Sequence, residues 1–246
     1  MRAAVISDVH ANLPALEAVL EAAEAAAVEE IWCLGDVVGY GAQPDACASL
    51  VKERCSVCLV GNHDLAVLGA LDVRTFSEYA AEAVHWTQME AAEPTLEFLR
   101  GLEPSGERDG VGLFHASPRD PVWEYVLSLD QAEDALDAQP QRIGLIGHSH
   151  VSLFFVRQED SRRDQAQGAQ AGDGAMLGLE RGTWLLNPGS VGQPRDGDPR
   201  SSYMVLDTEA ETTTWHRVAY DIDAVQSAMR ARRLPARLVE RLAVGL

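Results

Sequence analysis

Residues 57–64 read VCLVGNHD, a short apolar run that ends in a glycine and three polar residues. A similar arrangement occurs at residues 2–10, RAAVISDVH, and at residues 31–36, IWCLGD. Segments with apolar residues at helical spacing, at about 13–27 and 44–54, separate these three runs. Short apolar runs that alternate with helices of this length indicate βαβ units, and therefore a parallel, buried sheet.

Two further apolar runs, at 111–114 and 143–146, each lead into a loop that contains histidine. We expect the helical stretch at 65–102 either to cap a site or to pack as ordinary core. Further strands are predicted at 151–156, 175–179, 183–186, 203–206 and 212–218, with a mobile hairpin loop at 158–174 and a helix from residue 221. Since no linker or internal repeat divides the sequence, we expect a single domain over residues 1–246.

The composition is that of an ordinary globular protein with a strong negative charge. Hydrophobic residues make up 46% of the chain, and the formal net charge is −18. This charge disfavours binding to the many phosphates of a long nucleic acid, but it does not exclude a small phosphate-ester substrate. The sequence contains no apolar run of about 18 residues and no leader, so we expect no membrane association and a cytoplasmic location. It leaves the oligomeric state open.

The cysteines carry little functional signal. Cys55 and Cys58 form a CxxC motif, but a zinc ribbon needs a second such pair, which the sequence lacks. We therefore expect the four thiols, Cys33, Cys47, Cys55 and Cys58, to be structural.

The polar residues that follow the apolar runs are those that bind transition metals. In a parallel sheet the loops after the strands emerge at one edge, where ligands bind, so we expect these side chains to converge. Imidazole, carboxylate and amide groups suit divalent transition metals. The seven candidates are Asp8, His10, Asp36, Asn62, His115, His148 and His150. Seven ligands are too many for one ion, and two ions that share a carboxylate account for the number.

Each of these motifs alone is a weak signal, because an isolated D-x-H or H-x-H is usually a hydrogen-bonded structural feature. Their joint occurrence, in order and each at a strand end, favours a metal site over structural histidines. The glycine before Asp36, Asn62 and His148 fits the same interpretation, since the backbone must turn sharply there.

The ordered set D-x-H, G-D, G-N-H-D, H and G-H-x-H, from Asp8 to His150, resembles that of the calcineurin-like metallophosphoesterase superfamily. Its spacing is most similar to that of the small prokaryotic single-domain phosphodiesterases, and residues 187–195, NPGSVGQPR, are similar to a segment of that branch. The resemblance implies an α/β fold, a four-layer α/β/β/α sandwich of two mixed sheets flanked by helices, with a dinuclear metal centre at one edge.

Carried over by position, the resemblance assigns Asp8, His10, Asp36 and His150 to one ion, and Asp36, Asn62, His115 and His148 to the other. Asp36 is then the bridge. The implied reaction is hydrolysis of a phosphate ester, above all a phosphodiester, by in-line attack of a hydroxide that bridges the two ions. Manganese is the expected metal, and the ligands also suit iron, nickel, cobalt and zinc.

Catalytic roles follow for two neighbouring residues. His63 matches the non-ligand histidine of G-N-H-D, so it is a candidate general acid or phosphate-binding cation, with a spacer role as the alternative. We expect Asp64 to orient His63 by accepting a hydrogen bond from the imidazole.

Arg195 and Arg200 are candidates to bind the substrate phosphate, unless they only pair with nearby aspartates. The arginines between 230 and 241 are expected to form a solvated face.

Three other functions remain open. A phosphomonoesterase, acting on proteins or nucleotides, would use the same ligands. A non-catalytic scaffold of the same fold is disfavoured, because relatives of that type have lost the histidine at the position of His63, which is present here. A metal sensor would bind ions without turnover.

Overall fold

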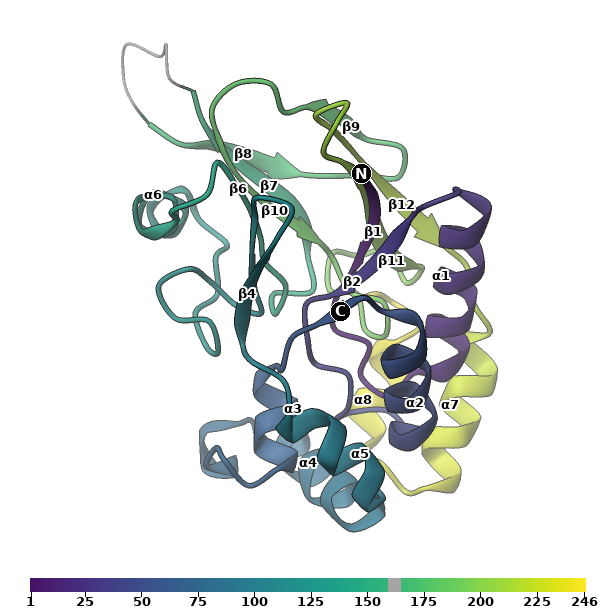
Figure 1. Ribbon diagram of the computed structural model, residues 1–246. Coiled ribbons are helices and arrows are strands. Elements are labelled where there is room, and N and C mark those ends of the chain that lie inside the picture. The colour runs from purple at the N-terminus through teal and green to yellow at the C-terminus, as the bar shows by residue number, and fades with distance from the viewer. Residues whose placement is uncertain (159–164) are drawn as a thin grey trace.

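The computed structural model describes residues 1–158 and 165–246, and two six-stranded mixed sheets form its centre (Figure 1). The first sheet has the order β3 (Val57–Cys58), β2 (Glu30–Cys33), β1 (Arg2–Ile6), β11 (Ser201–Asp207), β12 (Thr212–Val218) and β9 (Met176–Gly178). Strands β1, β2 and β3 are parallel, with Ala4 paired to Ile31, and β11, β12 and β9 are joined antiparallel. The chain thus forms the predicted βαβ units and then extends the sheet with late strands.

The second sheet has the order β4 (Ser105–Arg108), β5 (Val111–Phe114), β6 (Ile143–Leu145), β10 (Thr183–Pro188), β7 (Ser152–Arg157) and β8 (Gln167–Gln170). Strands β5, β6 and β10 are parallel, and β4, β7 and β8 pair antiparallel with their neighbours. The five predicted strand-end loops therefore come from two sheets. The apolar runs alone indicate one parallel sheet, because an apolar run does not reveal its pairing partner, whereas the resemblance implies the two mixed sheets that the structure has.

Buried side chains fill the space between the two sheets. Trp32 and Met204 of the first sheet pack with Leu113, Leu145 and Leu186 of the second in one hydrophobic cluster. Helices cover the outer faces: α1 (Leu13–Ala25) and α2 (Pro44–Arg54) pack on the first sheet, and α6 (Leu129–Ala138) packs on the second. This is the four-layer α/β/β/α sandwich.

The helical stretch expected at 65–102 is divided into several short helices. They are α3 (Asn62–Val67), η1 (Val73–Thr75), α4 (Glu78–Glu90) and α5 (Glu93–Arg100), and they lie together at one end of the molecule (Figure 1). Helix α4 packs there against α7 (Ile222–Ala231) and α8 (Ala236–Arg241), which are separated at Pro235.

Three elements were not predicted. Helix α6 and strand β4 lie in stretches to which the apolar pattern assigned nothing, and β8 lies inside the expected loop at 158–174. Residues 159–164 of that loop lie outside the described part of the chain. Among the residues that the structure describes, no helix is long and apolar enough to cross a membrane.

Candidate metal centre

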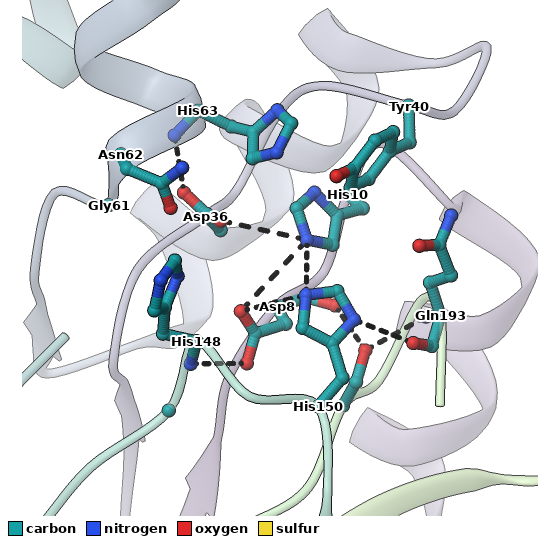
Figure 2. A network of polar contacts seen from close by, with 12 residues as sticks. Asp8, His10, Asp36, Tyr40, Gly61, Asn62, His63, His148, His150 and Gln193 are labelled. Carbon is teal, nitrogen blue, oxygen red and sulfur yellow. Dashed lines mark hydrogen bonds and ion pairs between the residues drawn. The ribbon is translucent and has the colours of Figure 1, made fainter. Parts of the chain in front are cut away.

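The strand-end loops of the two sheets meet along one line between the sheets, which we call the seam, and the seven metal-ligand candidates lie there. Six of them, all but His115, are labelled in Figure 2. The loops after β1 and β2 and the start of α3 supply Asp8, His10, Asp36 and Asn62. The loops after β5 and β6 of the other sheet supply His115, His148 and His150. All seven side chains are buried, at most 3% exposed.

Two groups of ligand atoms form within this cluster, each with its atoms within 4.8 Å of one another. They are Asp8, His10, Asp36 and His150, and Asp36, His115 and His148. Asp36 belongs to both: its Oδ2 lies 3.6 Å from His10 Nε2 and 3.7 Å from His115 Nε2. Asn62 Oδ1 lies 3.2 Å from His115 Nε2, beside the second group.

The hydrogen bonds of the histidine rings fix which nitrogen faces the seam. His10 Nδ1 donates to Val38 O at 3.2 Å, and His150 Nδ1 donates to Gln193 O at 2.6 Å. Because a carbonyl oxygen can only accept, each neutral ring carries its proton on Nδ1 and directs a lone pair from Nε2 into the seam. His115 follows the same pattern, with Nδ1 bonded to Leu34 O at 2.9 Å.

Several atoms at the centre are buried without a hydrogen-bond partner in the described structure. They are Asp8 Oδ1, Asp36 Oδ2 and His148 Nε2. Buried polar atoms are nearly always paired, so two carboxylate oxygens and an imidazole nitrogen grouped without partners indicate a site that binds cations. This donor set fits two divalent transition metals.

Burial also sets the charge state of these groups in the metal-free chain. Desolvation raises the pKa of Asp8 to about 7, and the neighbouring Asp36 adds to the rise while His115 opposes it. The pKa of Asp36 is raised well above its usual range, first by desolvation and then by Asp64. Desolvation likewise lowers the pKa values of His10, His148 and His150 well below the usual value. Neutral imidazoles are the form that binds metals.

The backbone at the centre is strained. Asp8, His10, Asp36, His148 and His150 all adopt left-handed conformations, with φ between 50° and 62°. Non-glycine residues seldom adopt this region, and five of them are grouped here. Gly61 is required for a different reason: a Cβ there would overlap the Asp36 carboxylate.

Residues 187–195, called the brace below, form hydrogen bonds to two of the candidate metal ligands. Asp8 O accepts hydrogen bonds from Ser190 Oγ at 2.8 Å and from Gly192 N at 2.9 Å. Gln193 holds the His150 ring through its carbonyl oxygen. This segment follows β10 of the second sheet yet fixes the loop after β1 of the first, so it connects the two sides of the seam.

The His63 ring lines a cavity above the metal centre, but Asp64 does not orient this ring. The Asp64 carboxylate accepts from the backbone N–H groups of Val37 at 3.2 Å, Val38 at 2.9 Å and Gly61 at 3.0 Å. No hydrogen bond joins it to the His63 ring in the described structure, so the expected contact was wrong. Asp64 instead ties the loop after β2 to the start of α3.

The two candidate phosphate-binding arginines differ in position. Arg195 lines the cavity, its Nη2 donates to Gln193 Oε1 at 3.0 Å, and its buried Nε has no hydrogen-bond partner in the described structure. Arg200 does not line that cavity and instead pairs with Asp198 at 2.7 Å and with Asp173 at 2.9 Å. Arg241 also lines the cavity, although we had assigned it to a solvated face.

A cavity of about 410 Å³ opens over the centre. Residues between Thr75 and Ala80 form one wall, so part of the segment proposed as a cap borders it. Trp123 and Tyr125, from the loop between β5 and α6, form another. Sequence reasoning missed these two residues, because their loop contains no recognisable motif.

None of the four cysteines belongs to either ligand group in the described structure. Cys33 and Cys58 are register partners on β2 and β3. Burial raises the pKa of the Cys55 thiol, and a hydrogen bond with Cys33 raises that of Cys58. A thiol with a raised pKa stays protonated and is a poor nucleophile, which fits a structural role.

Comparisons with known proteins agree with this architecture. A family model described as the calcineurin-like phosphoesterase superfamily domain matches residues 1–211. The crystal structure of a metallophosphoesterase from Sphaerobacter thermophilus is 40% identical, with a TM-score of 0.89, and the match covers 100% of this chain and 99% of that one. An uncharacterized protein of Methanocaldococcus jannaschii is 38% identical over 247 residues, 98% of this chain and 97% of its own. A hypothetical protein from Pyrococcus horikoshii, 18% identical, shares the fold with a TM-score of 0.78, and the match covers 100% and 98% of the two chains.

Proposed function

The chain belongs to the calcineurin-like phosphoesterase superfamily, and on this premise we propose that it hydrolyses phosphodiesters with the help of two divalent metal ions. One observation carries the proposal: the Asp36 carboxylate belongs to both ligand groups, and its Oδ2 is buried with no hydrogen-bond partner in the described structure. A single shared carboxylate is the arrangement that holds two ions close together.

We propose that Asp8, His10, Asp36 and His150 hold one ion, and that Asp36, Asn62, His115 and His148 hold the other. When bound, such ions supply an acidified water as nucleophile and offset the charge on the phosphoryl oxygens. Manganese is our first choice of metal; iron, nickel, cobalt and zinc suit the same ligands.

We propose that His63 acts on the leaving oxygen. Desolvation, with Arg195 and His115 nearby, lowers the pKa of the His63 imidazole well below its usual value. An anionic phosphate beside the ring opposes this shift, because it favours the charged form. The ring can then donate a proton to the departing alkoxide.

Arg195 is proposed to bind the substrate phosphate. Its guanidinium is held by Gln193 and lies over the Tyr40 ring, with the Cζ atom 5.8 Å from the ring centroid. The Nε donor without a partner is then free to hydrogen-bond a phosphoryl oxygen. We do not extend this role to Arg200, since its guanidinium forms ion pairs with Asp198 and Asp173.

The size of the cavity supports a diester. About 410 Å³ exceeds the volume of a phosphoryl group and leaves room for organic groups on both of its sides. One observation favours the alternative, a phosphomonoesterase: Arg241 is a second guanidinium at the cavity, and a monoester carries the larger negative charge.

A substrate screen tests the proposal. Turnover of para-nitrophenyl phosphate, its bis ester and cyclic nucleotides is measured with Mn²⁺ and with chelator. We expect metal-dependent hydrolysis of at least one diester. Hydrolysis of the monoester alone rejects the diesterase assignment, and metal binding without any turnover favours a scaffold or sensor.

We further propose that the substrate is a small phosphate ester and not a long nucleic acid, and that the protein is cytoplasmic.

A further inference from the structure

Aromatic side chains are concentrated at the cavity over the metal centre. Phe, Trp and Tyr make up 6% of the chain, yet they supply five of the 15 residues that line this cavity. They are Tyr40, Phe76, Tyr79, Trp123 and Tyr125. Metal binding and proton transfer use imidazoles, carboxylates and guanidinium groups, so the chemistry proposed above gives most of these rings no task.

Three of these rings form a continuous row with two histidines of the site. The Phe76 ring lies 5.0 Å from the His63 ring and 5.0 Å from the Trp123 ring, both edge to face. Trp123 lies 6.4 Å from His148, and Tyr125 stacks on His148 at 4.1 Å with an interplanar angle of 21°. The row therefore runs from the candidate proton donor to a candidate metal ligand.

The rings keep surface available at the cavity. Tyr125 is 41% exposed, although one of its faces covers His148. Phe76 and Trp123 are only half-buried. Aromatic faces grouped beside a charged site are the usual platform for a planar ring, because stacking on them tolerates many ring types.

We infer that the cavity selects phosphate esters that carry a planar aromatic group close to the phosphorus, as a nucleotide does. The base stacks on the row of Phe76, Trp123 and Tyr125, while the phosphate lies between the metal ligands and Arg195. Phosphosugars and alkyl phosphates lack this ring and bind more weakly. This inference rests on the proposed function, and it names the substrate class.

Adenosine 5′-monophosphate and ribose 5-phosphate form a matched pair of probes, because they differ only in the base. Their dissociation constants for the Mn²⁺-loaded protein are measured by calorimetry. We expect the nucleotide to bind roughly 5- to 150-fold more tightly, the range that stacking of one base supplies. Equal affinities for the two probes overturn the inference.

Three variants assign the preference to the row. Trp123→Leu and, separately, Tyr125→Leu should each reduce the preference for the nucleotide over ribose 5-phosphate at least about threefold. Leu127→Ala is the control, since Leu127 is 53% exposed in the same loop and does not line the cavity. Having two variants keeps the test valid if one of them fails to fold, which its thermal unfolding reveals. Unchanged preference in a folded variant, or an equal loss for both probes, contradicts the inference.

The experiments distinguish failure of the aromatic platform from failure of the proposed phosphodiesterase function. Tighter binding of the nucleotide without hydrolysis of any phosphate ester supports the aromatic platform and rejects the proposed function. Metal-dependent hydrolysis with equal binding of both probes overturns the platform alone.

Discussion

The Nε2 atoms of His10 and His150 face each other across 3.1 Å, although each ring already donates its Nδ1 hydrogen to a backbone carbonyl. Two lone pairs therefore point toward one another, and the Asp8 carboxylate lies 3.4 Å from the second of them. Without a cation, this arrangement is repulsive. An ion that accepts both lone pairs removes the repulsion, so metal binding and folding stability are coupled at this pair.

Mn²⁺ should stabilise the protein. An ion at about 100 times its dissociation constant adds about 2.7 kcal/mol to the free energy of unfolding. For a chain of this size, that is a rise in Tm of roughly 5 to 10 °C. Thermal unfolding with Mn²⁺ and with chelator measures it. His150→Ala should reduce the rise, and His85→Ala, on an exposed histidine, should not. Equal Tm values with and without the metal would contradict the coupling.

Asp36→Asn should lose both ions or their spacing, because the carboxylate touches both ligand groups. Removing a group that hydrogen-bonds to a metal ligand lowers activity about 10- to 100-fold. Replacing the ligand Asp36 itself should therefore lower activity at least about 100-fold. Elemental analysis and turnover measure the two effects. Asp72→Asn, at an exposed carboxylate paired with Arg74, is the control. Two fully bound ions in Asp36→Asn would refute the bridge.

His63→Ala should retain the metals and slow alkyl esters by about 10²- to 10⁴-fold, the usual contribution of a general acid. Aryl esters with a stable phenolate should be slowed far less, since they need no proton. The measurement is kcat for the two kinds of ester at the same metal occupancy. An equal loss on both would count against proton donation and favour a spacer role.

Arg195→Gln should lower kcat/KM about 10- to 100-fold, because a hydrogen bond to a charged group contributes about 1.5–3 kcal/mol. Arg200→Gln provides a matched comparison from the same loop, where the guanidinium pairs with Asp198 and Asp173. We expect it to change kcat/KM less than about twofold. If the two variants behaved alike, Arg195 would have no special role in phosphate binding.

Metal uptake should release protons below pH 7. In the metal-free chain burial raises the pKa of Asp8 to about 7, so its carboxyl is protonated at pH 6 and ionised at pH 8. A cation displaces that proton, so the affinity for Mn²⁺ should rise with pH through about 7, and Asp36, whose pKa is also raised, adds to the dependence in the same direction. Calorimetry of Mn²⁺ binding in buffers of different ionisation enthalpy counts the protons. Release that is no greater at pH 6 than at pH 8 would exclude this linkage.

The sequence predicts the ligand loops well because each D-x-H or G-H-x-H follows directly on an apolar run, and strand and loop are both local features. It does not show that His115, His148 and His150 come from a second sheet, since strand pairing depends on residues far apart in the chain. The partners of Asp64 were missed for the same reason: the amides of Val37 and Val38 lie 27 and 26 residues away. Arg241 looked solvated because its helix is short and rich in charge, and only tertiary packing brings it to the cavity.

The brace at 187–195 has a consequence for synthesis of the protein. The His150 ring is held by the carbonyl of Gln193 and the Asp8 carbonyl by Ser190, so both ligands lack these hydrogen bonds until that segment has left the ribosome. A nascent chain that ends before this point contains all seven ligands but lacks the groups that aim two of them.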